Sequence, residues 1–158
     1  MHYIDELIDD LMQGLQSEAQ ELVNEYWEQK TRENEHRPAD DRSYLGCRAL
    51  MKGGAPRIEW FKLKPVKRRD GSHRTYTEHI KKGRKGLRYP DHALKKHARV
   101  WQFEMVRDCE DRFAELRESI TALVEMRRQA RVLRQKRGLH FVGEVQNQEH
   151  QPAEKEAS

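Results

Sequence analysis

The stretch formed by residues 91–137 contains no proline and no glycine, and apolar side chains recur along it at every third or fourth position. This spacing places the apolar side chains on one face of an α-helix. They are Leu94, Ala98, Trp101, Met105, Cys109, Phe113, Leu116, Ile120, Leu123, Met126, Ala130 and Leu133. The pattern predicts one helix of about forty residues, which extends past any small sheet and needs a second helix to pack against.

A second amphipathic segment lies near the start of the chain, in residues 2–35. Its apolar positions follow one another at steps of three or four, and they are Ile4, Ile8, Leu11, Leu15, Ala19, Leu22 and Tyr26. Four acidic residues in its first turns complement the helix dipole, and Pro38 with the aspartates after it ends the helix. This acidic helix, from the same chain or from a second copy, is the nearest partner for the long one.

The residues between the two helical segments favour β-strands. Strands are predicted over residues 43–51, 57–67 and 73–80, and the second is the richest in β-branched and aromatic side chains. Asp70-Gly71 is typical of a tight hairpin turn between the second strand and the third. Pro65 has no amide hydrogen, so its strand is expected to lie at a sheet edge or to bulge there.

These elements predict an α+β protein, a three-stranded antiparallel sheet flanked by two long α-helices in the order α-β-β-β-α. The helical arms are expected to pack in an antiparallel or dimeric coiled-coil-like manner. The chain divides into an acidic N-terminal helix at 1–37, a basic sheet with the long C-terminal helix at 42–137, and a tail at 138–158. The tail is rich in Gln, Glu and small residues and is expected to be disordered.

Charge is distributed unevenly along the chain. Residues 42–99 carry eighteen Lys or Arg and four acidic residues, whereas residues 1–41 carry three Lys or Arg and twelve acidic residues. The net charge of the whole chain is only +4. A basic stripe of this density attracts polyphosphates, because each neutralised phosphate releases condensed counterions. Nucleic acid is therefore the first partner to consider, and a solvated basic face without a ligand is the alternative.

No residue pattern indicates catalysis. The motifs HExxH, GxxxxGK[ST] and GxGxxG are absent from the sequence, and the histidines are spaced too far apart to chelate one ion directly. Acidic pairs such as Glu110-Asp111 are adjacent on a helix, point in different directions and are predicted to be solvated. We therefore expect no enzyme activity, no cofactor and no metal site.

The compartment is predicted from the same sequence. No segment approaches the roughly 18 uninterrupted apolar residues of a membrane span, and the acidic N-terminus is unlike a signal peptide. Cys47 and Cys109 lack the paired spacing of a CxxC motif and are expected to be reduced, half-buried thiols. We expect a soluble, cytoplasmic protein.

The candidate DNA-binding residues lie in the predicted hairpin and in the basic loop after it, residues 81–88. They are Arg57, Lys62, Lys64, Lys67, Arg68, Arg69, Arg74, Lys81, Lys82, Arg84, Lys85 and Arg88. A hairpin turn with flanking cations can enter a DNA groove, and the loop glycines allow close approach to phosphates. Mainly phosphate contacts are expected; double-stranded DNA is the predicted partner, although single strands and RNA offer the same phosphates.

Trp60 and Tyr76 are candidates for base stacking. Side chains alternate between the two faces of a strand. One face would carry Ile58, Trp60, Lys62 and Lys64, and the other Glu59, Phe61 and Leu63. The second set is predicted to face the core, which leaves Trp60 outside among the lysines; the alternative is a Trp60 buried in the core at a bulge.

Several segments carry a family resemblance over about residues 43–120. They are Ile58-Glu59-Trp60-Phe61, the basic hairpin, Tyr76-Thr77-Glu78-His79-Ile80-Lys81-Lys82-Gly83, Arg88-Tyr89-Pro90, Trp101 and Glu110-Asp111-Arg112-Phe113. In these segments the chain resembles the MobI-type conjugative transfer proteins, small accessory proteins of integrative conjugative elements and related plasmids. The resemblance implies a non-catalytic DNA-binding protein that helps initiate DNA transfer at an origin of transfer, together with a relaxase.

Two other functions fit the same residues. A basic sheet before a long helix also occurs in phage and transposon DNA-binding modules. A protein–protein adaptor would instead use the basic sheet to bind an acidic partner, or the chain's own acidic helix. The opposite charges of residues 1–41 and 42–99 make such internal neutralisation physically reasonable.

Overall fold

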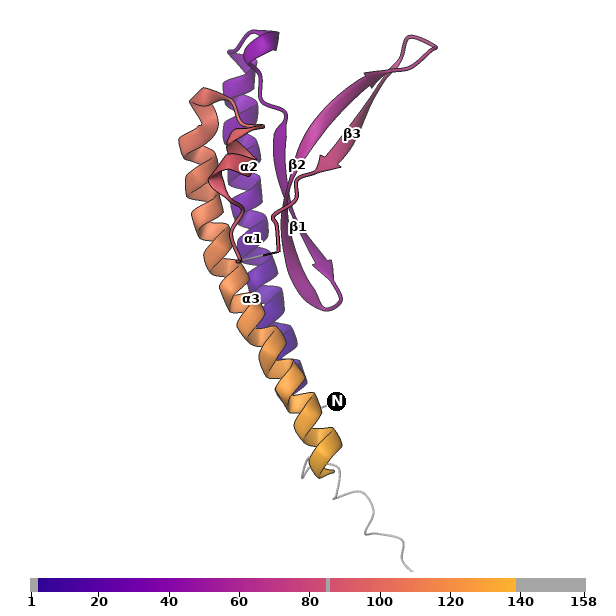
Figure 1. Ribbon diagram of the computed structural model, residues 1–158, viewed down its shortest axis with the longest axis vertical. Coiled ribbons are helices and arrows are strands. Elements are labelled where there is room, and N and C mark those ends of the chain that lie inside the picture. The colour runs from indigo at the N-terminus through magenta and orange to yellow at the C-terminus, as the bar shows by residue number, and fades with distance from the viewer. Residues whose placement is uncertain (1–2, 85, 139–158) are drawn as a thin grey trace, which may run out of the picture.

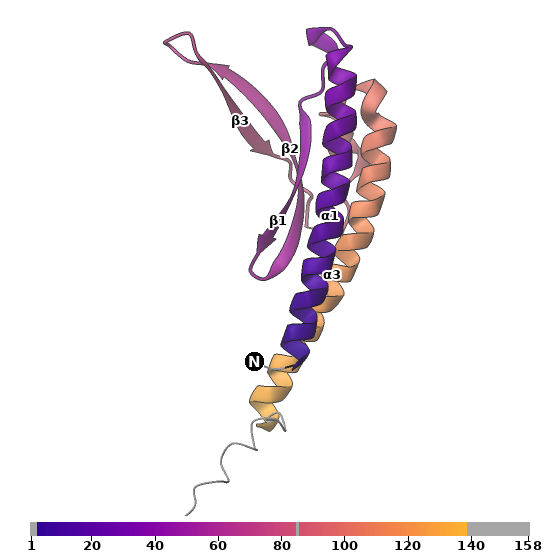
Figure 2. The ribbon, with the colours of Figure 1, turned by 180° about the vertical axis from the view of Figure 1, so that it is seen from behind.

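The computed structural model describes residues 3–84 and 86–138, so the predicted disordered tail lies outside the described residues apart from Gly138. Two long helices lie side by side, and a sheet covers one side of the pair (Figures 1 and 2). The helices are α1 (Tyr3–Glu35), α2 (Asp91–Lys95) and α3 (Phe103–Arg137), with short 3-10 turns η1 (Ala39–Asp41) and η2 (Val100–Gln102). The strands are β1 (Leu45–Lys52), β2 (Ala55–Lys67) and β3 (His73–His79).

The predicted α+β class and three-stranded antiparallel sheet are confirmed. The strand order is β1-β2-β3, and β1 pairs with β2 only as far as Leu45 opposite Lys62. The amide of Leu63 donates to the carbonyl of Tyr44, so Leu63 points its nitrogen toward the β1 side of the strand. The nitrogen of Pro65, two residues later, points to the same side, but β1 does not extend far enough to face it. Pro65 therefore lies at a local sheet edge, as its missing amide hydrogen requires.

The long helix packs against α1 of the same chain. Three ion pairs bridge them: Asp5 to Arg134 at 2.8 Å, Asp9 to Arg127 at 2.5 Å and Glu25 to Arg112 at 3.2 Å. Low residue numbers on α1 thus meet high numbers on α3, so the helices run antiparallel. None of the described helices is long and apolar enough to cross a membrane.

Trp60 is the centre of the core, so the predicted assignment of the β2 faces was wrong and the alternative, a buried Trp60, is confirmed. The expected bulge is not found there, because β1 pairs regularly with β2 on both sides of Trp60. Its side chain is fully buried, and its ring contacts Tyr26 of α1 and Phe113 of α3 at centroid distances of 5.1 and 5.8 Å. The face of β2 that carries Trp60 and Ile58 is covered by both helices. A buried indole is unavailable to a base, which removes Trp60 from the stacking candidates.

Phe61 points to the opposite face of the sheet and is nevertheless buried. Its ring lies 6.1 Å from that of Trp27, which comes from α1 and donates its indole N–H to the carbonyl of Cys47 at 2.8 Å. Gly46 makes this contact possible, because a Cβ there would lie 2.7 Å from the Phe61 ring. A glycine in β1 therefore lets a side chain from α1 reach the face of the sheet opposite to the one that carries Trp60.

The prediction of one uninterrupted helix from Asp91 was also wrong. The chain forms α2, turns, and begins α3 only at Phe103. Side chains in the break bond to other elements: Trp101 Nε1 donates to the Asp41 carbonyl at 2.9 Å, and Gln102 Nε2 donates to the Tyr26 hydroxyl at 3.1 Å. Gln102 Oε1 also accepts the amide of Arg99, which caps the turn. These bonds divert the chain without proline or glycine.

Lys30 of α1 gives a pH-dependent stability. It is 3% exposed, its ammonium lies 4.1 Å from the centre of the Trp27 ring, and burial lowers its pKa from 10.5 to about 8. Between these two values the unfolded chain binds more protons than the folded one, so stability rises with pH there. We expect Lys30→Met to raise the free energy of unfolding at pH 7 by about 1–3 kcal/mol and to remove that rise, measured by urea unfolding at pH 7 and 9.5. A wild-type stability that falls over this interval contradicts the assignment.

Candidate nucleic-acid interface

The far part of the β2–β3 hairpin projects from the body as a two-stranded arm, defined as residues 64–76. The β2–β3 pairing continues to Lys67 opposite His73, beyond the last residue of β1, and every residue of the arm is exposed. Figures 1 and 2 show the arm leaving the helices at an angle, with its turn remote from both of them. Both faces of this ribbon are therefore open to a ligand.

The arm is strongly basic. Its cations are Lys64, Lys67, Arg68, Arg69 and Arg74, and Asp70 is its single acidic residue. The Asp70 carboxylate accepts the hydroxyl and the amide of Ser72 at 2.6 and 2.9 Å, and these bonds lower its pKa. Asp70 thus shapes the turn between the two arginines and the third strand.

One face of the arm combines cations with an aromatic ring. Lys64 lies opposite Tyr76 and Val66 opposite Arg74, so these four side chains share a face. The Arg74 guanidinium lies 5.0 Å from the centre of the Tyr76 ring, and Tyr76 is 45% exposed. Lys64 also pairs with Glu78 at 3.2 Å, which lowers the pKa of that carboxyl. Tyr76 therefore keeps the exposure that base stacking requires, whereas Trp60 does not.

A second basic group lies at the base of the sheet. Lys81, Lys82 and Arg84 line one side of an open groove of about 510 Å³, and Arg57 and His79 line it from the sheet. Lys82 Nζ donates to the carbonyl of Gly86. Arg57 shares Glu59 with Arg48, at 3.8 and 3.0 Å, so part of its charge is compensated.

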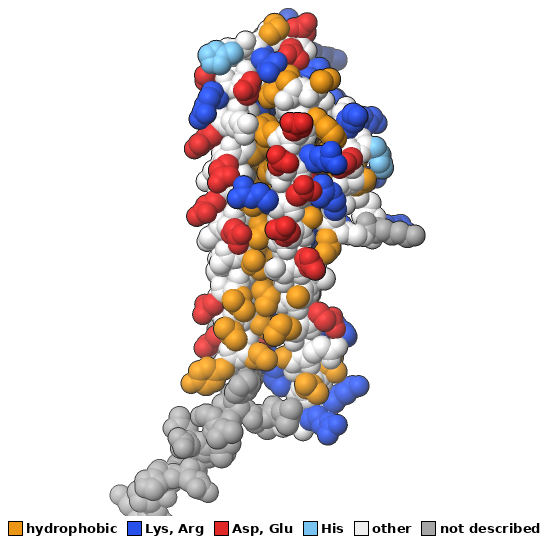
Figure 3. Space-filling model, turned by 90° about the vertical axis from the view of Figure 1, so that its left-hand side faces the viewer, with side chains coloured by type: hydrophobic (Ala, Val, Ile, Leu, Met, Phe, Trp, Pro, Cys, Tyr) orange, Lys and Arg blue, Asp and Glu red, His pale blue; other side chains and the backbone are white. Residues whose placement is uncertain are grey.

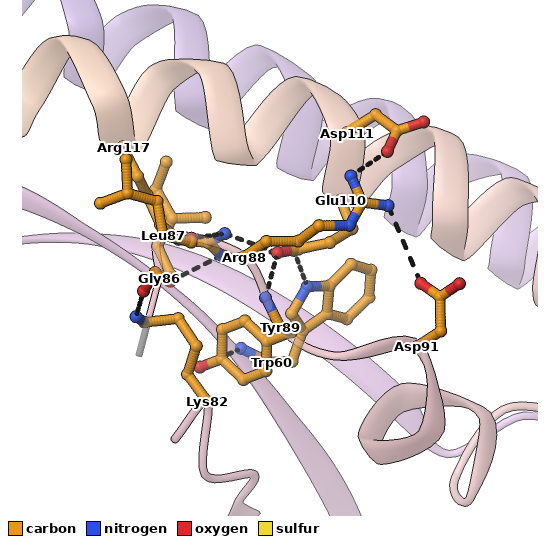
Figure 4. A network of polar contacts seen from close by, with 11 residues as sticks. Trp60, Lys82, Gly86, Leu87, Arg88, Tyr89, Asp91, Glu110, Asp111 and Arg117 are labelled. Carbon is orange, nitrogen blue, oxygen red and sulfur yellow. Dashed lines mark hydrogen bonds and ion pairs between the residues drawn. The ribbon is translucent and has the colours of Figure 1, made fainter. Parts of the chain in front are cut away.

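The other predicted site residues are placed differently. Arg88 turns toward α3, where it pairs with Asp111 and, at 3.8 Å, with Asp91 (Figure 4). Its charge is therefore compensated by carboxylates. Lys62 is half-buried at the base of the arm, and Lys85 lies outside the described residues.

A buried polar network fixes the end of the basic loop to the core (Figure 4). Glu110 is 1% exposed, which contradicts its predicted solvation. Its carboxylate accepts the indole N–H of Trp60 and the amide of Tyr89, both at 2.7 Å, and a guanidinium N–H of Arg117 at 2.6 Å. Arg117 also donates to the carbonyls of Leu87 and Ile58, at 2.9 and 3.2 Å. The network therefore joins α3, β2 and the loop.

The burial of Glu110 and Arg117 has a signal in the sequence. Their spacing places both on the helical face of Val106, Phe113 and Ile120, all of which are buried. Polar residues on an apolar face are expected to pair. Burial also raises the pKa of Tyr89, whose ring packs 5.1 Å from the Arg117 guanidinium.

Cys47 and Cys109 are free thiols; Cys47 is buried and Cys109 is half-buried. Burial is the main cause that raises the pKa of the Cys47 thiol, and the nearby Cys109 thiol adds to it. The two cysteines, distant in sequence, are therefore neighbours in the core. Within residues 3–84 and 86–138, no group of three or more His, Cys, Asp or Glu is arranged to hold a metal ion.

The fold is thus a two-helix body that carries a sheet with an exposed basic arm. A protein-family model described as MobI protein matches residues 15–131, which include most of α1 and of α3. The chain belongs to the MobI family. The family name marks it as a protein related to conjugative mobilisation. The match begins within the acidic helix, earlier than the resemblance at residues 43–120 indicated. No curated protein and no solved structure matches the chain.

Proposed function

We propose that this protein is a non-catalytic DNA-binding accessory protein that acts at an origin of transfer, together with a relaxase or another transfer protein, when conjugative DNA transfer begins. Membership of the MobI family supports the setting and the transfer partner. The observation that supports DNA binding is the arm, a basic ribbon that is exposed on both faces. Such a ribbon fits the major groove of duplex DNA, which is about 12 Å wide.

Duplex DNA explains the arm better than the chain's own acidic helix does. The acidic residues Asp5, Asp9 and Glu25 of α1 pair with arginines of α3, on the helical body. The expected internal neutralisation of the sheet by α1 is therefore not the arrangement found among the described residues. An external acidic protein is the remaining adaptor hypothesis, and a phage or transposon module the remaining DNA-binding one.

A salt series with a charge-matched control tests the proposal. We expect Arg68→Ser with Arg69→Ser to lower the affinity for duplex DNA about tenfold or more, and to reduce the slope of log affinity against log salt by about two. Arg32→Ser with Arg131→Ser removes the same charge from exposed helix positions and should change both values little. Gel shifts with an origin-of-transfer duplex and a random duplex provide the measurement and the sequence preference.

Two results would contradict the proposal. Wild-type protein that binds no DNA at low salt favours the adaptor that binds an acidic protein. Equal losses in the arm variant and in the helix control assign the effect to net charge, and the arm then has no special role.

A further inference from the structure

The side of the helix pair that faces away from the sheet carries an apolar groove. The groove, of about 590 Å³, is lined by Leu11, Gly14 and Leu15 of α1 and by Ala122 and Leu123 of α3, with Asp10 and Glu18 at its edge. Figure 3 shows hydrophobic side chains gathered over the lower half of this side. The patch includes large exposed residues, because Leu11 is 47% exposed and Met126, one turn from Ala122, is 50% exposed. The whole side of the helix pair that faces away from the sheet is called the outer face, and its lower half carries the apolar groove.

The upper half of the outer face is acidic. There a second groove between the helices is lined by Glu25, Glu104 and Asp108, with Arg112 paired to Glu25. Figure 3 shows acidic side chains along both sides of a narrow apolar seam in this half. A partner on the lower half must therefore avoid placing its own carboxylates against the upper half.

The outer face of α3 has a symmetric sequence. Counted from Glu115 to Arg137, positions at steps of 4, 3, 4, 4, 3 and 4 share this face of the helix. This series of steps is the same when it is counted from Arg137 back to Glu115. From the centre outward the residues are Met126, then Ala122 and Ala130, then Ser119 and Leu133, then Glu115 and Arg137. Two such helices, antiparallel with Met126 at the centre, would set each Glu115 opposite an Arg137.

We propose that the outer face binds a second copy of this chain, antiparallel, with the two-fold axis beside Met126. A parallel dimer would place the two acidic upper halves against each other, whereas the antiparallel one separates them and pairs Glu115 with Arg137. The stretch between these two residues is roughly 33 Å long, and two adjacent helices are roughly 20 Å wide. A footprint on the order of 600–700 Å² approaches the roughly 800 Å² per partner of a standard interface.

This dimer goes beyond the proposed function, because it concerns a surface remote from the arm. The two-fold axis turns one copy end over end, so the two arms leave the dimer on opposite sides and at opposite ends. If the arm binds DNA as proposed, the dimer holds two duplex segments. DNA binding by a single arm does not depend on the dimer, so either proposal can fail without the other.

Sedimentation equilibrium of the full chain, from about 1 to 200 µM, tests the dimer. Met126→Glu places two carboxylates at the axis and is expected to raise the dimer dissociation constant about 100-fold or more. Val124→Glu is the matched control, because Val124 is similarly exposed, at 45%, but lies on another face of α3. The control should leave the dissociation constant within about twofold, and circular dichroism checks the fold of both variants.

A charge swap tests the orientation. Glu115→Arg is expected to weaken the dimer about tenfold, and adding Arg137→Glu is expected to restore it, because only the antiparallel register brings these positions together. Several results overturn the proposal: a monomer at all concentrations, equal effects of Met126→Glu and Val124→Glu, or failure of the swap to restore the dimer. A chain that dimerises only when truncated after Gly138 also overturns it, since residues 139–158 would then be the occupant.

Discussion

Replacing the arm, residues 64–76, by an Asn-Gly turn between Leu63 and Thr77 is expected to remove most DNA binding and to leave the body folded. The replacement deletes five cations and one carboxylate. Affinity for duplex DNA should fall about 100- to 1,000-fold at low salt, with a clear loss of salt dependence, because several phosphate contacts disappear together. The measurement is a salt series of fluorescence anisotropy with the wild type and the armless chain.

The body should tolerate this change. All residues of the arm are exposed, and Leu63 already lies opposite Thr77, so a two-residue turn closes the shortened hairpin. The midpoint of thermal unfolding should therefore shift by only a few degrees, roughly what about 1 kcal/mol produces. An armless chain that unfolds at much lower temperature would show that the arm stabilises the sheet.

The loop provides the matched comparison. Lys81→Ser, Lys82→Ser and Arg84→Ser remove three cations from the groove at the base of the sheet, where Arg57 and His79 also lie. If the arm is the main contact, this triple variant loses less affinity than the armless chain. The reverse order would assign the main DNA contact to the groove instead of the arm.

The hairpin could be predicted from the sequence because its determinants are local. Asp70-Gly71 specifies the turn, and the charges around it show that no core covers it. The two helices were also predictable, since their apolar spacing extends over many turns. The end of α1 at Glu35, ahead of Pro38, agrees with the expected boundary.

The errors concern contacts between distant elements. Alternation in β2 distinguishes two faces but does not say which one the helices cover, so the sequence left both an outward and a buried Trp60 open. The break before Phe103 depends on bonds from Trp101 to Asp41 and from Gln102 to Tyr26, which lie 60 and 76 positions away in the sequence. Such partners leave no periodic trace in the local sequence.

Glu110 is a buried core residue whose loss should strongly destabilise the protein. Glu110→Ala is expected to lower the free energy of unfolding by about 3–5 kcal/mol, because the buried guanidinium of Arg117 loses its counterion. The same change leaves the indole N–H of Trp60 and the amide of Tyr89 without an acceptor. Urea unfolding followed by tryptophan fluorescence measures the loss.

Two variants show how much of the lost stability comes from breaking the buried Glu110–Arg117 ion pair. In Glu110→Leu with Arg117→Met both charges leave the core, so this double variant should recover the part of the loss that an unpaired buried charge causes. The part caused by the indole N–H of Trp60 and the amide of Tyr89, which still lack an acceptor, should remain. Asp111→Ala, next to Glu110 on the exposed side of α3, removes the pair with Arg88 and should cost at most about 1 kcal/mol. Losses of equal size for Glu110→Ala and Asp111→Ala would show that the Glu110 network does not stabilise the core.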